Sequence, residues 1–388
     1  MNSASFVNFD PSRVPSPCFV VDEAALEYNL QILARVQRES GAKILLALKA
    51  FSMFSLAPLI SRYLSGTCAS GLHEAKLGHE EFGGEVHTFS AAYTAADFPE
   101  ILSISQHVVF NSFSQWQRYK PQVTAAAKQR TNLKAGLRIN PQHSEGATAI
   151  YNPCAPGSRL GITVDQFEDQ SLDGITGLHF HTLCEQGFEP LARTLDAVEA
   201  QFGDILHTME WVNFGGGHHI THPDYNVDGL IQRLIEFSQR YKVQVYMEPG
   251  EAIAIHTGVL VTEVLDKSYN NMELAILDTS ATCHMPDTIE MPYRAGIFGS
   301  GTAGEKQYTY RLGGQTCLAG DVMGDYSFDQ PLQIGQRLMF DDMAHYTMVK
   351  TTTFNGIGLP SIAIWNAKTD ELNVIRQFDY GDFKQRLS

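Results

Sequence analysis

The first 250 residues alternate between short apolar runs and amphipathic helical stretches, and this alternation constrains the fold most strongly. The eight runs are Lys43–Lys49, Gly66–Ser70, Val86–Ser90, His107–Asn111, Leu133–Asn140, Gly174–His181, Met209–Phe214 and Val243–Glu248. They are apolar nearly throughout, as is typical of parallel strands that are buried on both faces. Eight strand–helix units predict a (β/α)8 barrel of the TIM type, with a doubly wound parallel sheet as the alternative.

The pattern changes after Gly250, where strand-like runs alternate with Gly- and Pro-rich turns. The runs are Thr257–Leu265, Glu273–Asp278, Gln307–Arg311 and Leu338–Phe340. A chain of 388 residues is long enough for about two domains. We therefore expect an α/β barrel over residues 22–255 and a mostly-β domain over residues 256–388. Residues 1–21 are too few for a domain of their own and are expected to pack with the β domain.

The balance of charge excludes some classes of partner. Lys and Arg number 28 and Asp and Glu number 43, which gives a net charge of −15. Nucleic-acid binders normally present a basic surface, so no nucleic-acid partner is expected. No run approaches 18 apolar residues and the N-terminus lacks a signal-peptide pattern, so we expect no membrane segment. The six scattered cysteines are typical of reduced thiols in a cytoplasmic protein.

Four features fall at the carboxyl ends of the predicted barrel strands, where barrel enzymes carry their catalytic residues. They are Lys49, the pair His179 and His181, the triplet Gly215–Gly217, and Glu248. Lys49 has apolar neighbours, and a buried amine favours its neutral, imine-forming state, although a strand-end lysine can also simply reach solvent. The glycines expose backbone N–H groups that suit a phosphate, or they form only a flexible turn.

The remaining candidates also have more than one interpretation. Glu248 is either a partner for a protonated ring nitrogen or an ordinary strand-end carboxylate. His181 either lies flat on a cofactor ring or is a hydrogen-bonded core histidine. A zinc site is the rival hypothesis, built from His179, His181 and His218-His219-x-x-His222. Zinc-dependent barrel hydrolases carry H-x-H on the first strand, whereas here it is on the sixth, so we expect no metal.

Together these features resemble the pyridoxal-phosphate (PLP) decarboxylases of the alanine-racemase fold, over nearly the whole chain. Gly177–His181 is similar to the GLHCH segment of diaminopimelate decarboxylases, and Glu248–Gly250 is similar to their EPG motif. The glycine triplet is similar to their phosphate loop. In the second domain, three segments are similar to the family's C-E-S-x-D, D-M-G-A-Y-T and F-N-G motifs: Cys317–Asp321, Asp342–Thr347 and Phe354–Gly356.

Departures from these motifs point to one branch of the family. Glu251 stands where the EPG motif continues with Arg, and Leu318 replaces the Glu of C-E-S-x-D. With Thr182–Cys184 and Met291–Arg294, these changes resemble the carboxynorspermidine decarboxylases, which act on carboxynorspermidine or carboxyspermidine. Diaminopimelate decarboxylase is the alternative within the family, and the loss of the acidic residue at Leu318 argues against it. An inactive regulator of the same fold is expected to lose the lysine or the cysteine, and both are present.

The resemblance implies a role for each candidate residue. Lys49 holds PLP as an imine, His181 stacks on its ring and Glu248 keeps the ring nitrogen protonated. The other cofactor-binding residues are Gly215, Gly216, Gly217 and Tyr346. Cys317 enters the site from a partner subunit as the proton donor, Asp321 contacts a substrate amine and Arg294 holds an anionic group. A polyamine substrate and a homodimer with shared active sites are therefore expected.

Overall fold

The structure, a computed structural model, describes residues 4–146 and 151–388. The chain divides into two compact units. Asn29–Ile253 form the barrel unit, and the residues up to Tyr28 together with Ala254–Ser388 form the β unit. The sequence predicted a barrel over residues 22–255, whereas the barrel unit runs from Asn29 to Ile253. Of the N-terminal segment expected to pack with the β domain, residues 1–3 lie outside the described residues.

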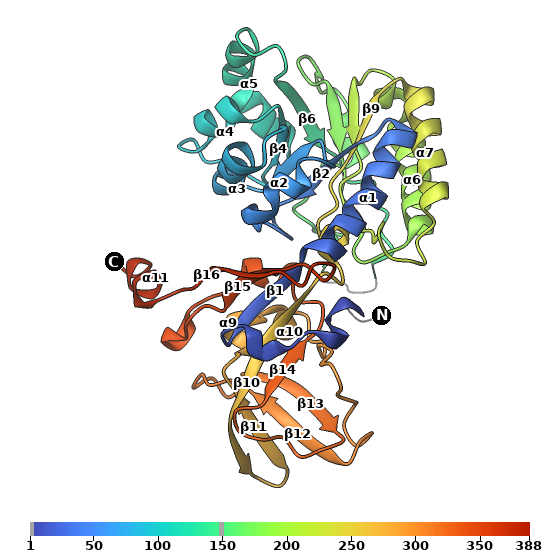
Figure 1. The fold of residues 1–388 in the computed structure, drawn as a ribbon. Helices are drawn as coiled ribbons and strands as arrows, with labels where there is room; N and C mark the ends of the chain where they lie inside the picture. Colours follow the sequence, from blue (N-terminus) through green and yellow to red (C-terminus); the bar gives the residue numbers. More distant parts are fainter. Residues whose placement is uncertain (1–3, 147–150) are drawn as a thin grey trace. The chain divides into compact units, whose positions relative to one another are not determined.

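Eight parallel strands close into a ring in the barrel unit (Figure 1). They are β2 (Lys43–Ala47), β3 (Gly66–Ala69), β4 (Glu85–Phe89), β5 (His107–Phe110), β6 (Lys134–Arg138), β7 (Gly177–His179), β8 (Trp211–Asn213) and β9 (Gln244–Met247). The ring closes where β2 pairs with β9, with Lys43 opposite Tyr246. The predicted TIM barrel is therefore confirmed.

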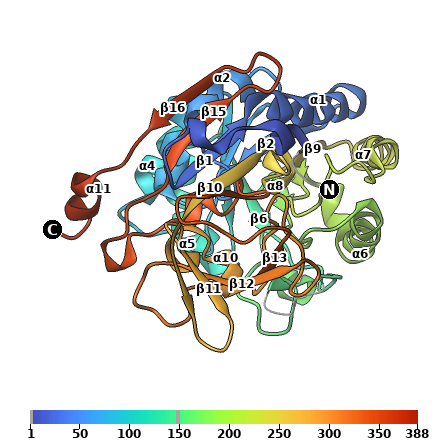
Figure 2. The same ribbon diagram turned by 60° about the horizontal axis from the view of Figure 1, so that its bottom comes forward.

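Helices follow most of the barrel strands and lie around the ring (Figures 1 and 2). The helices that follow barrel strands are α2 (Ala57–Ile60), α3 (Leu72–Leu77), α4 (Phe98–Ile104), α5 (Phe113–Ala127), α6 (Phe188–Leu206), α7 (Val227–Tyr241) and α8 (Glu251–Ala254). The long helix α1 (Glu23–Ser40) precedes the first barrel strand. Between β6 and β7 the described residues form only a 3-10 helix, Val164–Phe167, so the strand–helix repeat is irregular there. No helix in the described parts of the chain is long and apolar enough to cross a membrane.

The β unit contains a mixed sheet with the strand order β13-β12-β11-β10-β1-β15-β16, and β14 also pairs with β10. The strands are β1 (Cys18–Asp22), β10 (Gly258–Tyr269), β11 (Glu273–Leu277), β12 (Tyr308–Gly313), β13 (Val322–Phe328), β14 (Arg337–Phe340), β15 (Ser361–Trp365) and β16 (Leu372–Arg376). Its short helices are α9 (Ala281–His284), α10 (Asp287–Glu290) and α11 (Tyr380–Gln385). The second, mostly-β region predicted from the sequence is thus confirmed.

The N-terminal strand β1 joins the β unit, not the barrel. It pairs antiparallel with β10 and parallel with β15, and all five of its residues are buried. The segment that precedes the barrel in the chain therefore completes the sheet that follows the barrel.

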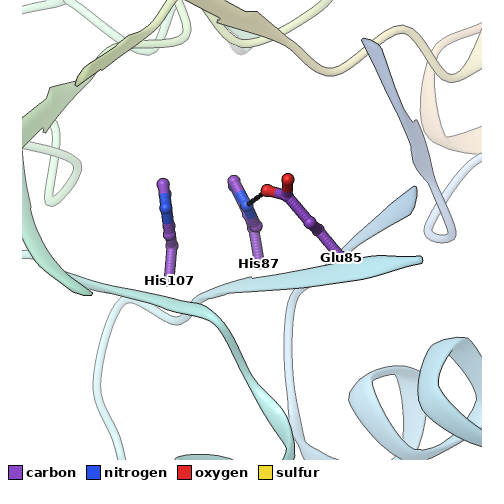
Figure 3. Close-up of side chains that lie close together, drawn as sticks. All are labelled: Glu85, His87 and His107. Carbon is purple, nitrogen blue, oxygen red and sulfur yellow. Dashed lines mark hydrogen bonds and ion pairs between the residues drawn. The ribbon is translucent and has the colours of Figure 1, made fainter. Parts of the chain in front are cut away.

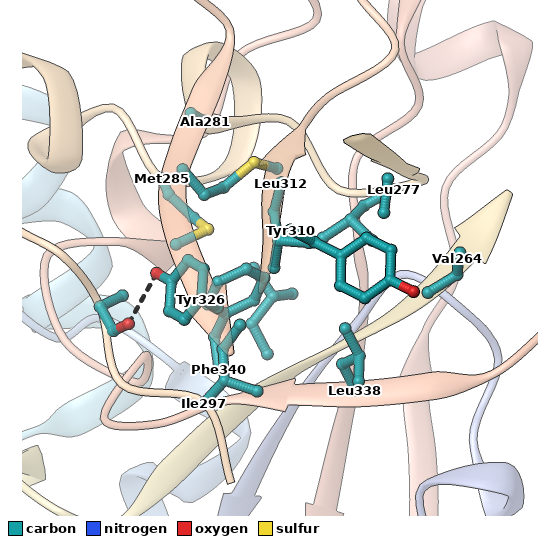
Figure 4. Close-up of a cluster of buried hydrophobic side chains, with 14 of the residues drawn as sticks. Val264, Leu277, Ala281, Met285, Ile297, Tyr310, Leu312, Tyr326, Leu338 and Phe340 are labelled. Atoms are coloured by element: carbon teal, nitrogen blue, oxygen red, sulfur yellow. Dashed lines mark hydrogen bonds between the residues drawn. The ribbon is translucent and has the colours of Figure 1, made fainter. Parts of the chain in front are cut away.

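The main core of the β unit fixes α9 against the sheet (Figure 4). Ala281 of α9 and the following Met285 are buried with side chains from β10 to β14. Tyr326 lies in the same core and donates its hydroxyl hydrogen bond to the Ala295 carbonyl at 2.7 Å, so its polar atom is satisfied. Burial of each large apolar side chain contributes roughly 1.5–3 kcal/mol to the free energy of folding. The core therefore holds α9 in place beneath the loops that contact it.

Candidate active site

A buried carboxylate lies at the carboxyl end of the barrel, directly after β9. Glu248 Oε1 accepts a hydrogen bond from the Asn213 amide at 2.7 Å, and Glu248 Oε2 accepts one from His179 Nε2 at 3.2 Å. Asn213 ends β8 and His179 ends β7, so three neighbouring strands supply one network. The Glu248 side chain is only 14% exposed.

The network holds Glu248 ionised. Burial alone would raise the pKa of this carboxyl, but its interactions with His179 and the hydrogen bond from Asn213 outweigh burial and lower it. Burial lowers the pKa of His179 despite the neighbouring carboxylate, so the ring is neutral at pH 7. The Cys68 thiol of β3 also bonds to Glu248, and burial raises its pKa well above the ordinary value. The result is a buried anion surrounded by neutral donors.

The glycine triplet after β8 packs tightly against the ends of two other strands. A Cβ at Gly215 would lie 2.5 Å from the Phe180 carbonyl oxygen, and one at Gly216 would lie 2.1 Å from that of Glu248. A Cβ at Gly217 would lie 1.9 Å from the Leu183 carbonyl oxygen. Gly215 and Gly217 also have φ of +66° and +86°, in the region that favours glycine. Each glycine is therefore required for this backbone path.

The expectation of three consecutive free N–H groups in this loop is wrong. The Gly215 N–H donates to Asn213 Oδ1 at 2.8 Å, and the Gly216 N–H donates to His181 Nδ1 at 3.0 Å. Two of the three amides thus position neighbouring side chains, because the loop folds back onto the ends of β7 and β8. Only the Gly217 amide has no such partner among the described residues.

His181 lies two residues beyond β7 and is held by the glycine loop. Because its Nδ1 accepts the Gly216 N–H, its ring proton lies on Nε2. Burial, followed by the charges of Lys49 and Arg138, lowers the pKa of His181 well below the ordinary value. Arg138 ends β6 and donates to the His181 carbonyl at 3.3 Å, so it braces this residue. His181 is therefore a neutral ring in a fixed orientation.

Lys49 differs from the sequence expectation in one respect. It follows β2 by two residues and is exposed, although Leu48 and Ala50 beside it are buried. The argument that burial drives this amine towards its neutral form is wrong, because apolar neighbours in sequence do not enclose a side chain that leaves the end of a strand. Its charge nevertheless acts on His181, His179 and Cys68, which places Lys49 at the same end of the barrel.

The histidines of the zinc hypothesis do not converge. His179 pairs with Glu248, His181 with the Gly216 amide, and His218 Nδ1 with the Tyr225 hydroxyl at 2.6 Å. His219 Nε2 lies 3.2 Å from Glu251 Oε1, and Glu251 is the residue that stands where the family motif has Arg. Glu251 is thus paired with an imidazole beside the glycine loop.

One group in the described residues comes close enough to suggest a metal site, and it lies near the starts of the strands (Figure 3). His87 Nε2 bonds to Glu85 Oε2 at 2.9 Å, and the His87 and His107 rings stack with centroids 3.8 Å apart at 20°. A histidine holds zinc at about 2.0–2.1 Å along a lone pair in its ring plane, and two stacked rings cannot both aim such lone pairs at one ion. The pair therefore packs as part of the barrel core.

The β unit carries the exposed thiol of Cys317 on the loop between β12 and β13. Asn355 Oδ1 accepts hydrogen bonds from the Cys317 backbone N–H at 2.9 Å and from its thiol at 3.0 Å. Leu318, the next residue, is 45% exposed. A thiol and an apolar side chain thus project together from this loop.

The structure gives Asp321 a different role from the one expected. Its carboxylate is buried, and four donors already fill its four lone-pair sites. They are the Ser280 hydroxyl, the Thr282 N–H, the Thr316 N–H and the Thr316 hydroxyl, at 2.6–3.2 Å. A substrate amine would have to displace these donors, so we assign Asp321 to holding the Cys317 loop.

Two further candidates also lie in the β unit. Arg294 is exposed, and its guanidinium carbon lies 4.5 Å from the centroid of the Tyr326 ring in a cation–π contact. Tyr346 has a φ of +49°, uncommon for a bulky residue. Asp342, four residues earlier, accepts the His256 N–H at 2.6 Å and fixes the start of this loop.

Comparison with known proteins decides between the remaining hypotheses. The family described as "Pyridoxal-dependent decarboxylase, C-terminal sheet domain" matches residues 18–344. The chain belongs to this family of pyridoxal-dependent decarboxylases. The prediction of a carboxy-lyase is therefore confirmed.

Individual decarboxylases resemble the chain over almost its full length. A carboxyaminopropylagmatine decarboxylase from Synechocystis is 45% identical, over 97% of this chain and 96% of the relative. A carboxynorspermidine/carboxyspermidine decarboxylase from Campylobacter jejuni is 43% identical, over 96% and 99%. The crystal structure of carboxynorspermidine decarboxylase with norspermidine, from the same organism, has a TM-score of 0.88 at 42% identity and covers 96% of this chain and 100% of that one.

Diaminopimelate decarboxylases are more distant from this decarboxylase. The enzyme from Archaeoglobus fulgidus is 24% identical, over 96% of this chain and 93% of the relative. The structure of the Helicobacter pylori enzyme with L-lysine has a TM-score of 0.79 at 17% identity, with 97% of each chain covered, and so shares the fold. The resemblance to the carboxynorspermidine branch inferred from Leu318 and Glu251 is confirmed.

Sequence reasoning missed two members of the network around Glu248. Asn213 ends β8 just before the glycines, and Cys68 lies in β3. Asn213 could have been found by the same signal that identified Lys49, because both are polar residues at the end of an apolar run. Cys68 gave no such signal, because a cysteine inside an apolar run is typical of any buried strand.

Proposed function

We propose that this protein removes CO2 from carboxynorspermidine or carboxyspermidine with pyridoxal phosphate bound at the carboxyl end of the barrel. Support for the substrate comes from relatives with these names at 39–43% identity. Support for the location comes from the Glu248 network, the single observation that carries the proposal. In the reaction a C–C bond breaks, CO2 leaves, and the carbon keeps the electron pair and accepts a proton.

The residues around Glu248 fit the proposed cofactor. Pyridoxal phosphate, when bound, supplies an electron sink for the pair that departing CO2 leaves behind. A buried carboxylate kept ionised by neutral donors is suited to hold a proton on a nearby ring nitrogen. Gln at this position would lose that charge while it kept the hydrogen-bonding shape.

The remaining barrel residues fit the other parts of the cofactor. His181 presents a neutral ring in a fixed tautomer, which suits stacking on an aromatic face. The glycine loop leaves the Gly217 amide for a phosphate group, with the Gly215 and Gly216 amides bracing the site. Lys49 presents an exposed amine that would hold the cofactor through its aldehyde group.

Three residues of the β unit complete the proposal. The Cys317 thiol gives its proton to the carbon that has lost CO2, and the resemblance implies that it comes from a second copy of the chain. We propose an obligate homodimer in which each site combines one barrel with the partner's cysteine loop. Tyr346 is proposed to bind the cofactor, and Arg294 stays a proposed contact for an anionic group.

Mixing of inactive variants tests the shared site. Lys49→Ala and Cys317→Ala should each be inactive alone. A random heterodimer contains one site with both defects and one with neither, so mixing should restore up to about a quarter of the wild-type sites. Absence of recovery after proven subunit exchange would show that each site is built from one chain.

Carboxyaminopropylagmatine is a second candidate substrate, because a decarboxylase named for it is 45% identical to this chain. It ends in a guanidinium where carboxyspermidine ends in an ammonium, so the two substrates differ at the end farthest from the lost carboxylate. We propose that Leu318, with the groups that surround it in the proposed dimer, determines which of the two substrates the enzyme prefers.

Product analysis tests the proposed function. The enzyme is offered carboxynorspermidine, carboxyspermidine, carboxyaminopropylagmatine and diaminopimelate side by side, and kcat/KM is compared for each. We expect carboxynorspermidine or carboxyspermidine to give the highest value. A higher value for carboxyaminopropylagmatine would favour the second candidate, and a higher value for diaminopimelate would overturn both.

A further inference from the structure

Asn355 belongs to the F-N-G segment, for which the resemblance supplies no role. Its single amide oxygen accepts both the backbone N–H and the thiol of Cys317, at 2.9 and 3.0 Å. Both side chains are exposed, and an exposed cysteine without such a partner rotates among three χ1 wells. The paired hydrogen bonds therefore select one direction for the S–H group.

The backbone around Asn355 is built for this contact. Asn355 has a φ of +58°, in the left-handed region that asparagine tolerates better than most residues, and Gly356 follows with +75°. The two positive φ values turn the chain sharply within the 3-10 segment Phe354–Gly356. This turn presents the Asn355 amide to the neighbouring loop.

The two turns that meet at Cys317 are fixed to the same short helix, α9. The Thr352 N–H donates to the Cys283 carbonyl at 2.8 Å, and the Cys283 thiol lies 3.5 Å from the Phe354 carbonyl. On the other side, Asp321 takes hydrogen bonds from Ser280 and Thr282 at the start of α9. The buried core beneath α9 therefore sets the distance between Asn355 and Cys317.

We propose that Asn355 is a positioning residue that aims the Cys317 S–H group at the carbon to which it gives its proton. An amide oxygen stabilises the S–H form, because it can accept a hydrogen but offers nothing to a thiolate. In the transfer the S–H bond breaks and a C–H bond forms at the carbon that has lost CO2. The thiolate then takes a proton from water, which restores the bond to Asn355. This inference rests on the role proposed for Cys317.

Alkylation of Cys317 in the folded holoenzyme separates this role from a merely structural one. Asn355→Gly removes the acceptor but tolerates the left-handed backbone, and it should speed iodoacetamide labelling at pH 7.5 by about 3- to 10-fold. Asn355→Asp keeps the acceptor and adds a negative charge that disfavours the thiolate, so it should slow labelling by about 3- to 10-fold. Peptide mass spectrometry assigns the label to Cys317.

Asn271→Gly is the matched control. Asn271 also has a positive φ, +57°, but lies in the turn between β10 and β11. In the Asn271→Gly protein, the rate of iodoacetamide labelling at Cys317 should match that of the wild type. Changes of the same sign in both Asn355 variants, or no change in either, would overturn the proposal, because loosening of a loop does not distinguish Asp from Gly by sign.

Turnover separates failure of this inference from failure of the proposed function. Asn355→Gly should lower kcat by about 10-fold with KM within about twofold, because it disturbs proton delivery and not binding. Full kcat in Asn355→Gly would count against the inference. Full activity of Cys317→Ser would instead show that Cys317 is not the proton donor, and the proposed function would fail at that residue. Opposite shifts in the labelling rate of the two Asn355 variants would still establish the contact between Asn355 and Cys317.

Discussion

The first barrel strand, β2, begins with Lys43 and is followed two residues after its end by Lys49. Each lysine lies at the same end of the barrel as a glutamate–histidine pair. Lys43 opens the strand and pairs with Glu85, which also bonds to His87. Lys49 follows the strand at the end where Glu248 bonds to His179. The residue types are the same, but only one set belongs to the proposed active site.

The difference lies in what the charged groups have around them. Glu85 is paired with a cation, and it also accepts the Tyr246 hydroxyl at 3.1 Å, so its charge is used within the protein. Glu248 instead accepts hydrogen bonds from the Asn213 amide and the neutral His179 ring. An unneutralised carboxylate near an exposed amine is available to a ligand. In the proposed account, position along the strand, and not the residue type, separates the reactive set from the set that packs in the barrel core.

Replacement of the two lysines should produce the largest contrast. Lys49→Ala should lower kcat on the order of 10³-fold or more, about 4 kcal/mol at 1.36 per decade, because the cofactor loses its covalent attachment. Lys43→Ala should leave kcat within about threefold and cost about 1 kcal/mol or less in the free energy of unfolding. Steady-state assays and urea unfolding measure the two effects. Equal losses of activity in both variants would break the comparison.

Replacement of the two glutamates should separate turnover from stability. Glu248→Gln should lower kcat by about 10²-fold, or 2.7 kcal/mol, while cofactor retention stays near the wild-type level. Glu85→Gln should instead lower the free energy of unfolding by about 1–3 kcal/mol, since it leaves His87 and Lys43 without their carboxylate. Cofactor absorbance, turnover and denaturation are measured for each. Near-normal turnover in Glu248→Gln would mean that another group manages the ring nitrogen.

The pH dependence of stability should reveal the buried histidines at the Glu85 end. Burial, then the charges of His87, Lys134 and Lys43, lower the pKa of His107 in the folded state. The unfolded chain then binds a proton that the folded barrel does not, so stability is lost as pH falls below the unfolded value near 6.5. One such histidine costs about 1.4 kcal/mol by pH 5.5.

His107→Leu should therefore flatten the decline in unfolding free energy between pH 7.5 and 5.5 by about that amount. Glu85 and Glu248 do not interfere, because carboxyls with a lowered pKa affect stability only below the unfolded value near 4.5. Parallel curves for His107→Leu and the wild type would show that the folded barrel protonates this ring.

The sequence predicted the barrel because its signal is local and repeated. Apolar runs buried on both faces define the strands, and their ends place Lys49, His181 and Glu248 at one rim. The expected burial of Lys49 was wrong because the apolar run outlasts the strand: β2 ends at Ala47, and the chain has turned by Lys49. Periodicity does not show where a strand stops within such a run.

The β unit was harder to predict because its contacts join distant parts of the chain. β1 pairs with β15 more than 300 residues later, and no local pattern shows that. Asp321 was expected to contact substrate because of its place in a sequence motif. The motif does not reveal that Ser280, Thr282 and Thr316 already donate hydrogen bonds to the Asp321 carboxylate. The contact between Asn355 and Cys317 depends in the same way on tertiary structure.

Borohydride reduction tests most directly whether the Lys49 end of β2 is the reactive one. The holoenzyme is reduced, digested and mapped by mass spectrometry, so that an imine becomes a stable label on the lysine that formed it. We predict the pyridoxyl label on Lys49 and none on Lys43, with both peptides recovered from the same digest. A label on Lys43 or on any other lysine would contradict the account.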